Sequence, residues 1–159
     1  MNESVNTTSL RSHKSQWYEC VVHYPKTQED GTIKNVSESY VVEALSFTEA
    51  ETRFTAEMSK YISADFTIKN INPMPFNEVF FSGYPEDDKF YLCKVAFITL
   101  DEKSEKEKKS YTNYLIQAST TMGAHNTIDQ VMRKSMIDYH VVSIRETKYI
   151  DIFEYVKTL

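Results

Sequence analysis

The chain repeats itself: when its sequence is shifted by 73 or 74 positions, similar residues fall on one another in the same order. Residues 17–24 (WYECVVHY) match residues 90–97 (FYLCKVAF), keeping two leading aromatic residues, a cysteine, a valine and a closing aromatic residue. The further matches are residues 40–44 with 114–118, 50–62 with 124–136, 66–71 with 139–144, and 78–80 with 151–153. Because a collinear match in several segments is typical of a repeat architecture, we expect an internal duplication of one structural unit.

Each repeat predicts the same order of elements: strand, charged turn, strand, helix, strand and a short final strand. Alternation in the first strand of the first repeat defines a face that we expect to pack on the helix. This face consists of Tyr18, Cys20, Val22 and Tyr24. The predicted fold class is therefore α+β, with two β-β-α-β(-β) units, mostly antiparallel sheet and one helix per unit.

The two predicted helices differ at their beginnings. Ser46 is followed three residues later by Glu49, which predicts a capping box at the start of the first helix. The second repeat has Thr120 and Gly123 at these positions and lacks the carboxylate. We therefore expect the second helix to begin late or loosely.

The composition along the chain predicts its boundaries. Residues 1–16 are rich in Ser, Thr and Asn, and we expect a disordered tail there. Repeat unit 1 then covers residues 17–82 and repeat unit 2 covers residues 90–159, with residues 83–89 as a linker. Units of about 70 residues are small for independent stability, so we expect the two to pack as one globular domain.

The sequence contains no catalytic or metal-binding signature. The chain has three glycines, too few for the clustered glycines of phosphate-binding loops. Cys20 and Cys93 lack zinc-ligand spacing, and we interpret both as reduced, buried thiols. No histidine lies beside a serine-nucleophile motif. We therefore expect a non-enzymatic protein with no catalytic residue, no metal and no cofactor.

The charge is distributed unevenly. The whole chain has a net charge of −5, which disfavours binding to duplex DNA. Residues 17–82 hold 5 basic and 10 acidic residues, whereas residues 90–159 hold 10 and 9. No apolar stretch reaches the roughly 18 to 20 residues of a membrane span, and no signal-peptide pattern is present. We expect a cytoplasmic protein with no membrane partner.

The sheet faces opposite the helices are the candidate binding surfaces. In the first repeat the candidate ligand-binding residues are Trp17, His23 and Lys69, and in the second they are Phe90, Lys94 and Arg145. Most strand aromatics are interpreted as core residues, and Trp17, Phe90 and Tyr111 are the exceptions that could stack on bases. The open face of the second repeat is more apolar, which favours a protein partner or self-association, with a homo-oligomer as one outcome.

Three stretches carry a resemblance to a known family: residues 17–20 (WYEC), 44–51 (ALSFTEAE) and 97–103 (FITLDEK). Together they resemble a domain-of-unknown-function family of small proteins from Bacteroides-type bacteria and their phages. The similarity spans residues 17 to about 155. The resemblance implies a phage or mobile element as the source, and it implies no active site.

Three hypotheses for the function follow. The first is a non-enzymatic phage or mobile-element accessory protein that binds a partner through the sheet face or the groove between units. The second is a binder of single-stranded nucleic acid in replication or recombination, working through Trp17, Lys69, Phe90 and Lys94. The third is a sequestering protein for a small charged ligand such as a signalling nucleotide.

Overall fold

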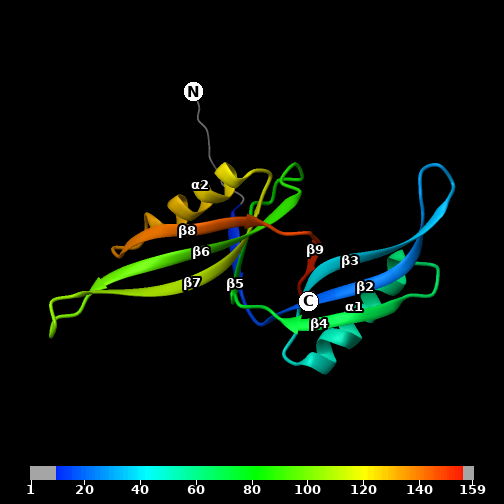
Figure 1. The fold of residues 1–159 in the computed structure, drawn as a ribbon, viewed down its shortest axis with the longest axis horizontal. Helices are drawn as coiled ribbons and strands as arrows, with labels where there is room; N and C mark the ends of the chain where they lie inside the picture. The colour runs from blue at the N-terminus through cyan, green and yellow to red at the C-terminus, as the bar shows by residue number, and fades with distance from the viewer. Residues whose placement is uncertain (1–9, 156–159) are drawn as a thin grey trace, which may run out of the picture. The chain divides into compact units, whose positions relative to one another are not determined.

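The structure is a computed structural model that describes residues 10–155 (Figure 1). This part of the chain contains nine strands and two helices, so the predicted α+β class is confirmed. In chain order the elements are β1 (Arg11–Lys14), β2 (Trp17–Thr27), β3 (Ile33–Glu43), α1 (Phe47–Tyr61), β4 (Thr67–Pro73), β5 (Glu78–Phe81), β6 (Lys89–Leu100), β7 (Glu107–Ala118), α2 (Thr121–Met132), β8 (Asp138–Glu146) and β9 (Tyr149–Phe153).

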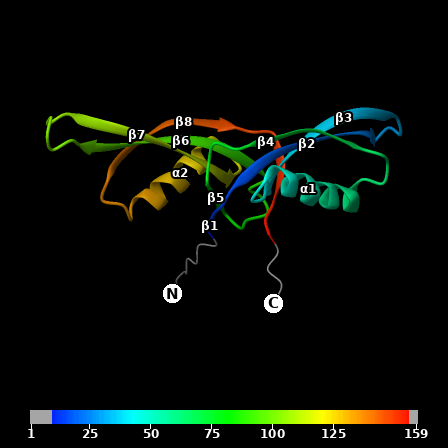
Figure 2. The same cartoon turned by 90° about the horizontal axis from the view of Figure 1, so that it is seen from below.

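The chain forms two compact units, and each is discontinuous in sequence. The four-stranded unit comprises Ser15–Pro75 and the segment from Lys148 onward, with the strand order β4-β2-β3-β9. The five-stranded unit comprises the segment up to Lys14 and Phe76–Thr147, with the order β1-β5-β7-β6-β8. In each unit one helix lies on one face of the sheet, α1 in the first and α2 in the second (Figure 2). Corresponding strands thus take corresponding places, while an origin by duplication stays a prediction.

The short final strands pair outside the repeat that precedes them. β5 ends the first repeat but pairs in parallel with β7. β9 ends the second repeat but pairs in parallel with β3. The unit boundaries therefore differ from the predicted 17–82 and 90–159, because each repeat contributes its last strand to the other unit's sheet. The pairs β5–β7 and β3–β9, which join each exchanged strand to its receiving strand, are parallel. The other strand pairs among the described residues are antiparallel.

Part of the predicted tail is ordered. Arg11–Lys14 forms β1, which pairs antiparallel with β5 and places Arg11 opposite Phe81. The Arg11 guanidinium lies 4.1 Å from the centre of the Phe81 ring, and Leu10 packs against the core. The segment has little apolar surface, so main-chain hydrogen bonds to β5 hold it rather than burial. Residues 1–9 of the predicted tail lie outside the described residues.

Each unit has its own core between helix and sheet. The predicted helix-facing set of the first strand is confirmed, because Cys20 and Val22 are buried there and Tyr18 and Tyr24 pack against the same cluster. The exchanged strand adds an aromatic residue to the core in both units. Phe153 stacks on Tyr40 with ring centres 5.5 Å apart. Phe80 meets Tyr114 at the same 5.5 Å separation, edge to face.

The helix beginnings agree with the predicted caps in one respect and differ in another. The Ser46 hydroxyl accepts the Glu49 N–H at 3.1 Å, and the Glu49 carboxylate accepts the Leu45 N–H at 2.7 Å. In α2 the Thr120 hydroxyl accepts the Gly123 N–H at 2.9 Å. The expected late start of α2 is wrong, since Thr121 is the equivalent of Phe47. The hydroxyl cap alone suffices to begin the helix at the same place.

The two units have equivalent hydrogen bonds, which fix the chain where each exchanged strand ends. The Tyr155 N–H, two residues after β9, donates to Glu43 Oε1 at 2.7 Å. The Ser82 N–H, directly after β5, donates to Gln117 Oε1 at 2.9 Å. Glu43 and Gln117 occupy matching places near the ends of β3 and β7. One side-chain acceptor therefore holds each exchanged strand in register at its exit.

Replacing this acceptor should destabilise the fold. We expect Glu43→Ala to lower the free energy of unfolding by about 1 to 3 kcal/mol, because the buried Glu43 side chain is removed and the Tyr155 N–H loses its acceptor. Glu43→Gln should stay near the parent, since Gln117 makes the same bond in the other unit. Urea denaturation followed by circular dichroism measures both, with the exposed Glu29→Ala as the control. Equal stability of Glu43→Ala and Glu43→Gln would contradict the assigned role.

Both cysteines should be chemically silent in the folded protein. Cys20 and Cys93 have no exposed surface, and burial raises the pKa of each thiol to about 12. The reactive thiolate is therefore scarce at neutral pH. A disulfide-based thiol reagent at pH 8 should label neither cysteine in the native protein and both after denaturation. Labelling of the native protein faster than it unfolds would show that one thiol is accessible.

Candidate functional site

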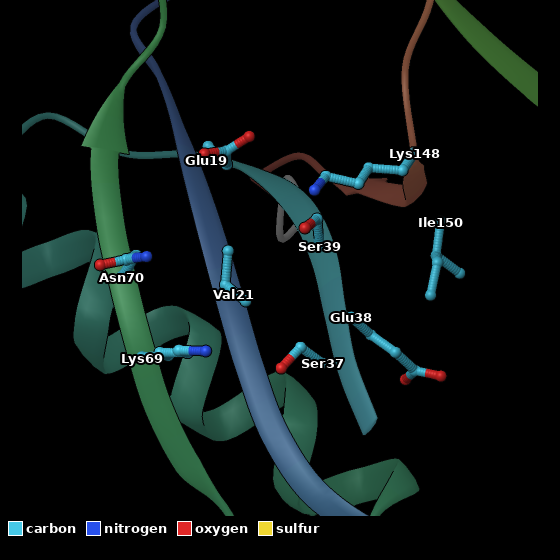
Figure 3. A pocket seen from close by; sticks show the side chains of 9 residues that line it. All are labelled: Glu19, Val21, Ser37, Glu38, Ser39, Lys69, Asn70, Lys148 and Ile150. Atoms are coloured by element: carbon cyan, nitrogen blue, oxygen red, sulfur yellow. The ribbon is translucent and has the colours of Figure 1, made fainter. Parts of the chain in front are cut away.

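A hollow of about 350 Å³ opens on the face of the four-stranded sheet that lies away from α1 (Figure 3). Its lining comes from all four strands of the sheet and the residue before β9. The lining residues are Glu19, Val21, Ser37, Glu38, Ser39, Lys69, Asn70, Lys148 and Ile150. We call this site the open-face hollow.

Strand alternation sets the floor of the open-face hollow. Cys20 and Val22 point into the core below α1, so Glu19 and Val21 lie on the opposite face. The register pairs Val21 with Ser39 of β3 and with Asn70 of β4. Neighbouring strands thus place one apolar and two polar side chains next to one another on the open face.

A β-bulge in β4 brings Lys69 to the same face. Val21 pairs with Asn70 and the next residue, Val22, pairs with Ile68, so Lys69 is the extra residue of the bulge. Ile68 and Ile71 both pack against the helix-side core. Lys69 and Asn70 therefore both lie on the open face, whereas regular alternation from Ile71 would have directed Lys69 to the core. A bulge of this kind commonly redirects a side chain near a functional site.

Lys148 enters the site with the exchanged strand. It directly precedes β9, which pairs with β3 at the edge of the sheet. In Figure 3 its side chain extends toward β3 and ends near Ser39, while the Lys69 side chain extends from β4 toward β2. Two ammonium groups thus reach over one floor from opposite sides. Sequence reasoning selected Lys69 but missed Lys148, because only the strand exchange brings residue 148 beside β3.

The charges of the open-face hollow are largely unpaired. Within residues 10–155, Lys69, Lys148 and Glu19 have no ion-pair partner within 4 Å. Glu38 is different, because its carboxylate accepts from Lys26 Nζ at 3.1 Å and from the Tyr24 hydroxyl at 2.8 Å. Figure 3 shows the Glu38 carboxylate pointing away from the hollow.

Two ammonium groups therefore stand against one unpaired carboxylate. The surrounding unit is acidic: its described residues hold 6 basic and 11 acidic side chains, a net charge of −5. Burial and the hydrogen bond to Glu38 raise the pKa of Tyr24 to about 12, so this hydroxyl stays protonated and keeps donating at neutral pH. The hollow is thus a locally cationic place on an acidic unit, and it favours an anionic oxygen group.

A serine and a histidine meet beside the open-face hollow. His23 Nδ1 lies 3.1 Å from the Ser37 hydroxyl, an arrangement that resembles two members of a nucleophilic triad. No carboxylate or carbonyl in residues 10–155 orients the other ring nitrogen of His23. Among the described residues there is also no group of three metal-ligating side chains. Within the described residues, the His23–Ser37 pair therefore lacks the third member of a triad.

The six predicted ligand-binding residues do not share one site. Lys69 lines the open-face hollow, and His23 lies beside it through its bond to Ser37. Trp17 and Phe90 are only 2% and 5% exposed, so their rings offer no surface for stacking. The prediction that they lie on an open sheet face is therefore wrong. Both are large apolar side chains near strand beginnings, and removing their surface from water stabilises the fold.

The remaining two residues lie together elsewhere. Lys94 of β6 and Arg145 of β8 both lie on the open face of the five-stranded sheet, because their neighbours Cys93, Val95 and Ile144 pack toward α2. Lys94 pairs with Ser143, and Arg145 pairs with Leu92. The two cations are therefore diagonal neighbours on adjacent strands.

A family profile described as a domain of unknown function, DUF4494, matches residues 16–155. No curated protein and no solved structure matches the chain. Within the described residues, neither helix is long and apolar enough to cross a membrane. Since the matched region covers most of the chain, the protein belongs to the DUF4494 family of domains of unknown function.

Proposed function

We propose that this protein is a non-enzymatic binding protein that holds a small anionic ligand in the open-face hollow. The observation that carries the proposal is that the ammonium groups of Lys69 and Lys148 lie on one sheet face, each without a carboxylate partner among the described residues. Two like charges held over a common floor repel each other. An anion bound between them turns this repulsion into two charge-assisted hydrogen bonds.

The other lining residues narrow the class of ligand. Ser37, Ser39 and Asn70 offer further hydrogen-bond donors for oxygen atoms, and Glu19 offers an acceptor for an amino or hydroxyl group. Val21 and Ile150 supply apolar surface against which a ring can lie. A nucleotide combines a phosphate, a flat ring and exocyclic donors. The proposed ligand is therefore a small nucleotide.

Sequestration is the proposed role, because the hollow offers binding groups without a complete catalytic constellation. The resemblance to proteins of Bacteroides-type bacteria and their phages supports a phage or mobile-element accessory protein. In this proposal the protein acts in the host cytoplasm, where it lowers the free concentration of a signalling nucleotide. Retention without turnover distinguishes this role from that of an enzyme.

Calorimetric titration with a panel of mono-, di- and cyclic nucleotides tests the proposal. We expect one or more nucleotides to bind, with Lys69→Gln and Lys148→Gln each weakening the affinity about tenfold, which is about 1.4 kcal/mol. Lys34→Gln is the matched control, because Lys34 is an exposed lysine of the same sheet outside the hollow. Lack of binding by every nucleotide at low salt, or equal affinity of the lysine variants and the parent, would overturn the proposal.

Glu19 should discriminate between simple anions and nucleotides. We expect Glu19→Gln to bind inorganic phosphate several-fold more tightly, because a like charge near the ammonium pair is removed. The same variant should lose affinity for nucleotides whose exocyclic amine donates to Glu19. Phosphate titration monitored by amide chemical shifts measures the first effect. Unchanged phosphate affinity in Glu19→Gln would place Glu19 outside the site, and weaker phosphate binding would contradict the expected repulsion.

A further inference from the structure

The open face of the five-stranded sheet carries a line of cationic and aromatic side chains that the open-face hollow does not use. Strand alternation and register place four of these side chains at successive levels of β6, on β6 itself or on a strand that pairs with it. Lys109 lies opposite Ile98, Tyr111 opposite Ala96, and Arg145 opposite Leu92, while Lys94 belongs to β6 itself. We call Lys109, Tyr111, Lys94 and Arg145 the diagonal stripe.

The diagonal stripe is regular. Measured along β6, its members stand at the levels of residues 98, 96, 94 and 92, so each step advances two residues. Two residues of antiparallel strand span about 7 Å. The stripe also moves from β7 across β6 to β8. An extended row of this kind, which advances about 7 Å along the strand direction at each step, suits a linear chain of charges better than a compact ligand.

The stripe is exposed and its cations are unpaired. Lys94, Lys109 and Arg145 are all exposed, and within the described part of the chain none has a carboxylate within 4 Å. Two acidic residues lie on the same face near the Lys109 end of the stripe. Asp138 stands at the level of Ile98, which is also the level of Lys109, and Glu107 stands beyond the stripe at the level of Leu100. Three cations therefore face solvent without an internal counter-ion.

Tyr111 gives the stripe an aromatic surface. Its side chain is 55% exposed, although the Lys94 ammonium lies 4.7 Å from the ring centre. Polar side chains, Asn113 and Ser143, flank Lys94 on the neighbouring strands. An exposed ring among cations is the combination with which proteins hold single strands, since bases stack on the ring and phosphates meet the cations.

The four-stranded sheet lacks all four groups at the equivalent positions. The register matches Lys94 with Val21, Tyr111 with Ser37, Lys109 with Asn35, and Arg145 with Asn72. The same backbone arrangement thus forms with neutral residues. The charged stripe is dispensable for the sheet, which favours a role in binding over a role in folding.

We propose that the diagonal stripe binds single-stranded nucleic acid, as a second binding site separate from the open-face hollow. Phosphates contact Lys109, Lys94 and Arg145, and one base stacks on Tyr111. In this proposal the base stacks on the exposed Tyr111, because Trp17 and Phe90 are buried. The site tolerates many sequences, because stacking and phosphate contacts do not read base edges.

Fluorescence anisotropy of the full chain with labelled oligothymidine of about 12 nucleotides tests this site. Binding should weaken with salt with a log–log slope of about −2, as three phosphate contacts on a single strand predict. Lys94→Val and Arg145→Asn, which copy the four-stranded sheet, should each weaken binding about tenfold and reduce the slope by about 0.7. Tyr111→Ser should weaken binding with an unchanged slope, and Tyr111→Phe should bind like the parent.

Controls separate this site from the hollow and from misfolding. Lys69→Gln, in the open-face hollow, and Lys103→Gln, in the turn after β6, should bind the oligonucleotide like the parent. Thermal unfolding of each variant checks that the sheet is intact. No binding at low salt, parent-like binding by Lys94→Val, or equal affinity for duplex DNA would overturn the proposal. Equally effective competition by polyglutamate would also overturn it and assign the stripe to an acidic protein.

Discussion

The parallel pairing of two exchanged strands is the interaction on which the rest of this structure depends. β5 completes the sheet around β7, and β9 completes the sheet around β3. Each exchanged strand brings a phenylalanine onto a tyrosine of the receiving sheet, Phe80 on Tyr114 and Phe153 on Tyr40. Each is then held at its exit by a side-chain acceptor, Gln117 or Glu43. Neither unit has a complete sheet without a strand from a distant part of the sequence.

This exchange also builds the candidate site. Lys148 reaches the open-face hollow because β9 lies beside β3, and Lys69 reaches it because of the bulge in β4. The second sheet has a bulge at the matching place, where the register skips Val142. There the extra residue is apolar, so the same backbone device presents no ammonium group. The backbone sets the positions, and substitutions at those positions make the two open faces chemically different.

The two proposed sites divide the charge of the protein in an informative way. The hollow, for which we propose a small anion, lies within a unit of net charge −5, and the surrounding carboxylates of this unit would repel a long polyanion. The described residues of the five-stranded unit hold 11 basic and 11 acidic side chains. Its stripe is therefore free of an overall repulsion. The net charge of the surrounding unit therefore explains why we propose a short ligand for the hollow and a long one for the stripe.

Much of the fold could be predicted from the sequence, because it depends on local patterns. Alternation identified the strands and the faces that pack on the helices, as Cys20 and Val22 show. The Ser46 hydroxyl identified the start of α1. The candidate site was predicted only in part: Lys69 was selected, whereas Trp17 and Phe90 proved buried and Lys148 was missed.

By itself, then, the sequence determined which segments from residue 17 onward are strands and helices, which strand residues face a helix, and how the charge is distributed. The tertiary structure alone decided where β5 and β9 pair, that Arg11–Lys14 adds a strand, and that Lys69 turns to the open face. The physical reason is that side-chain patterns encode burial and local conformation. Main-chain hydrogen bonds between strands are the same for every sequence. Which sheet edge accepts a given strand is therefore settled only when the whole chain has packed.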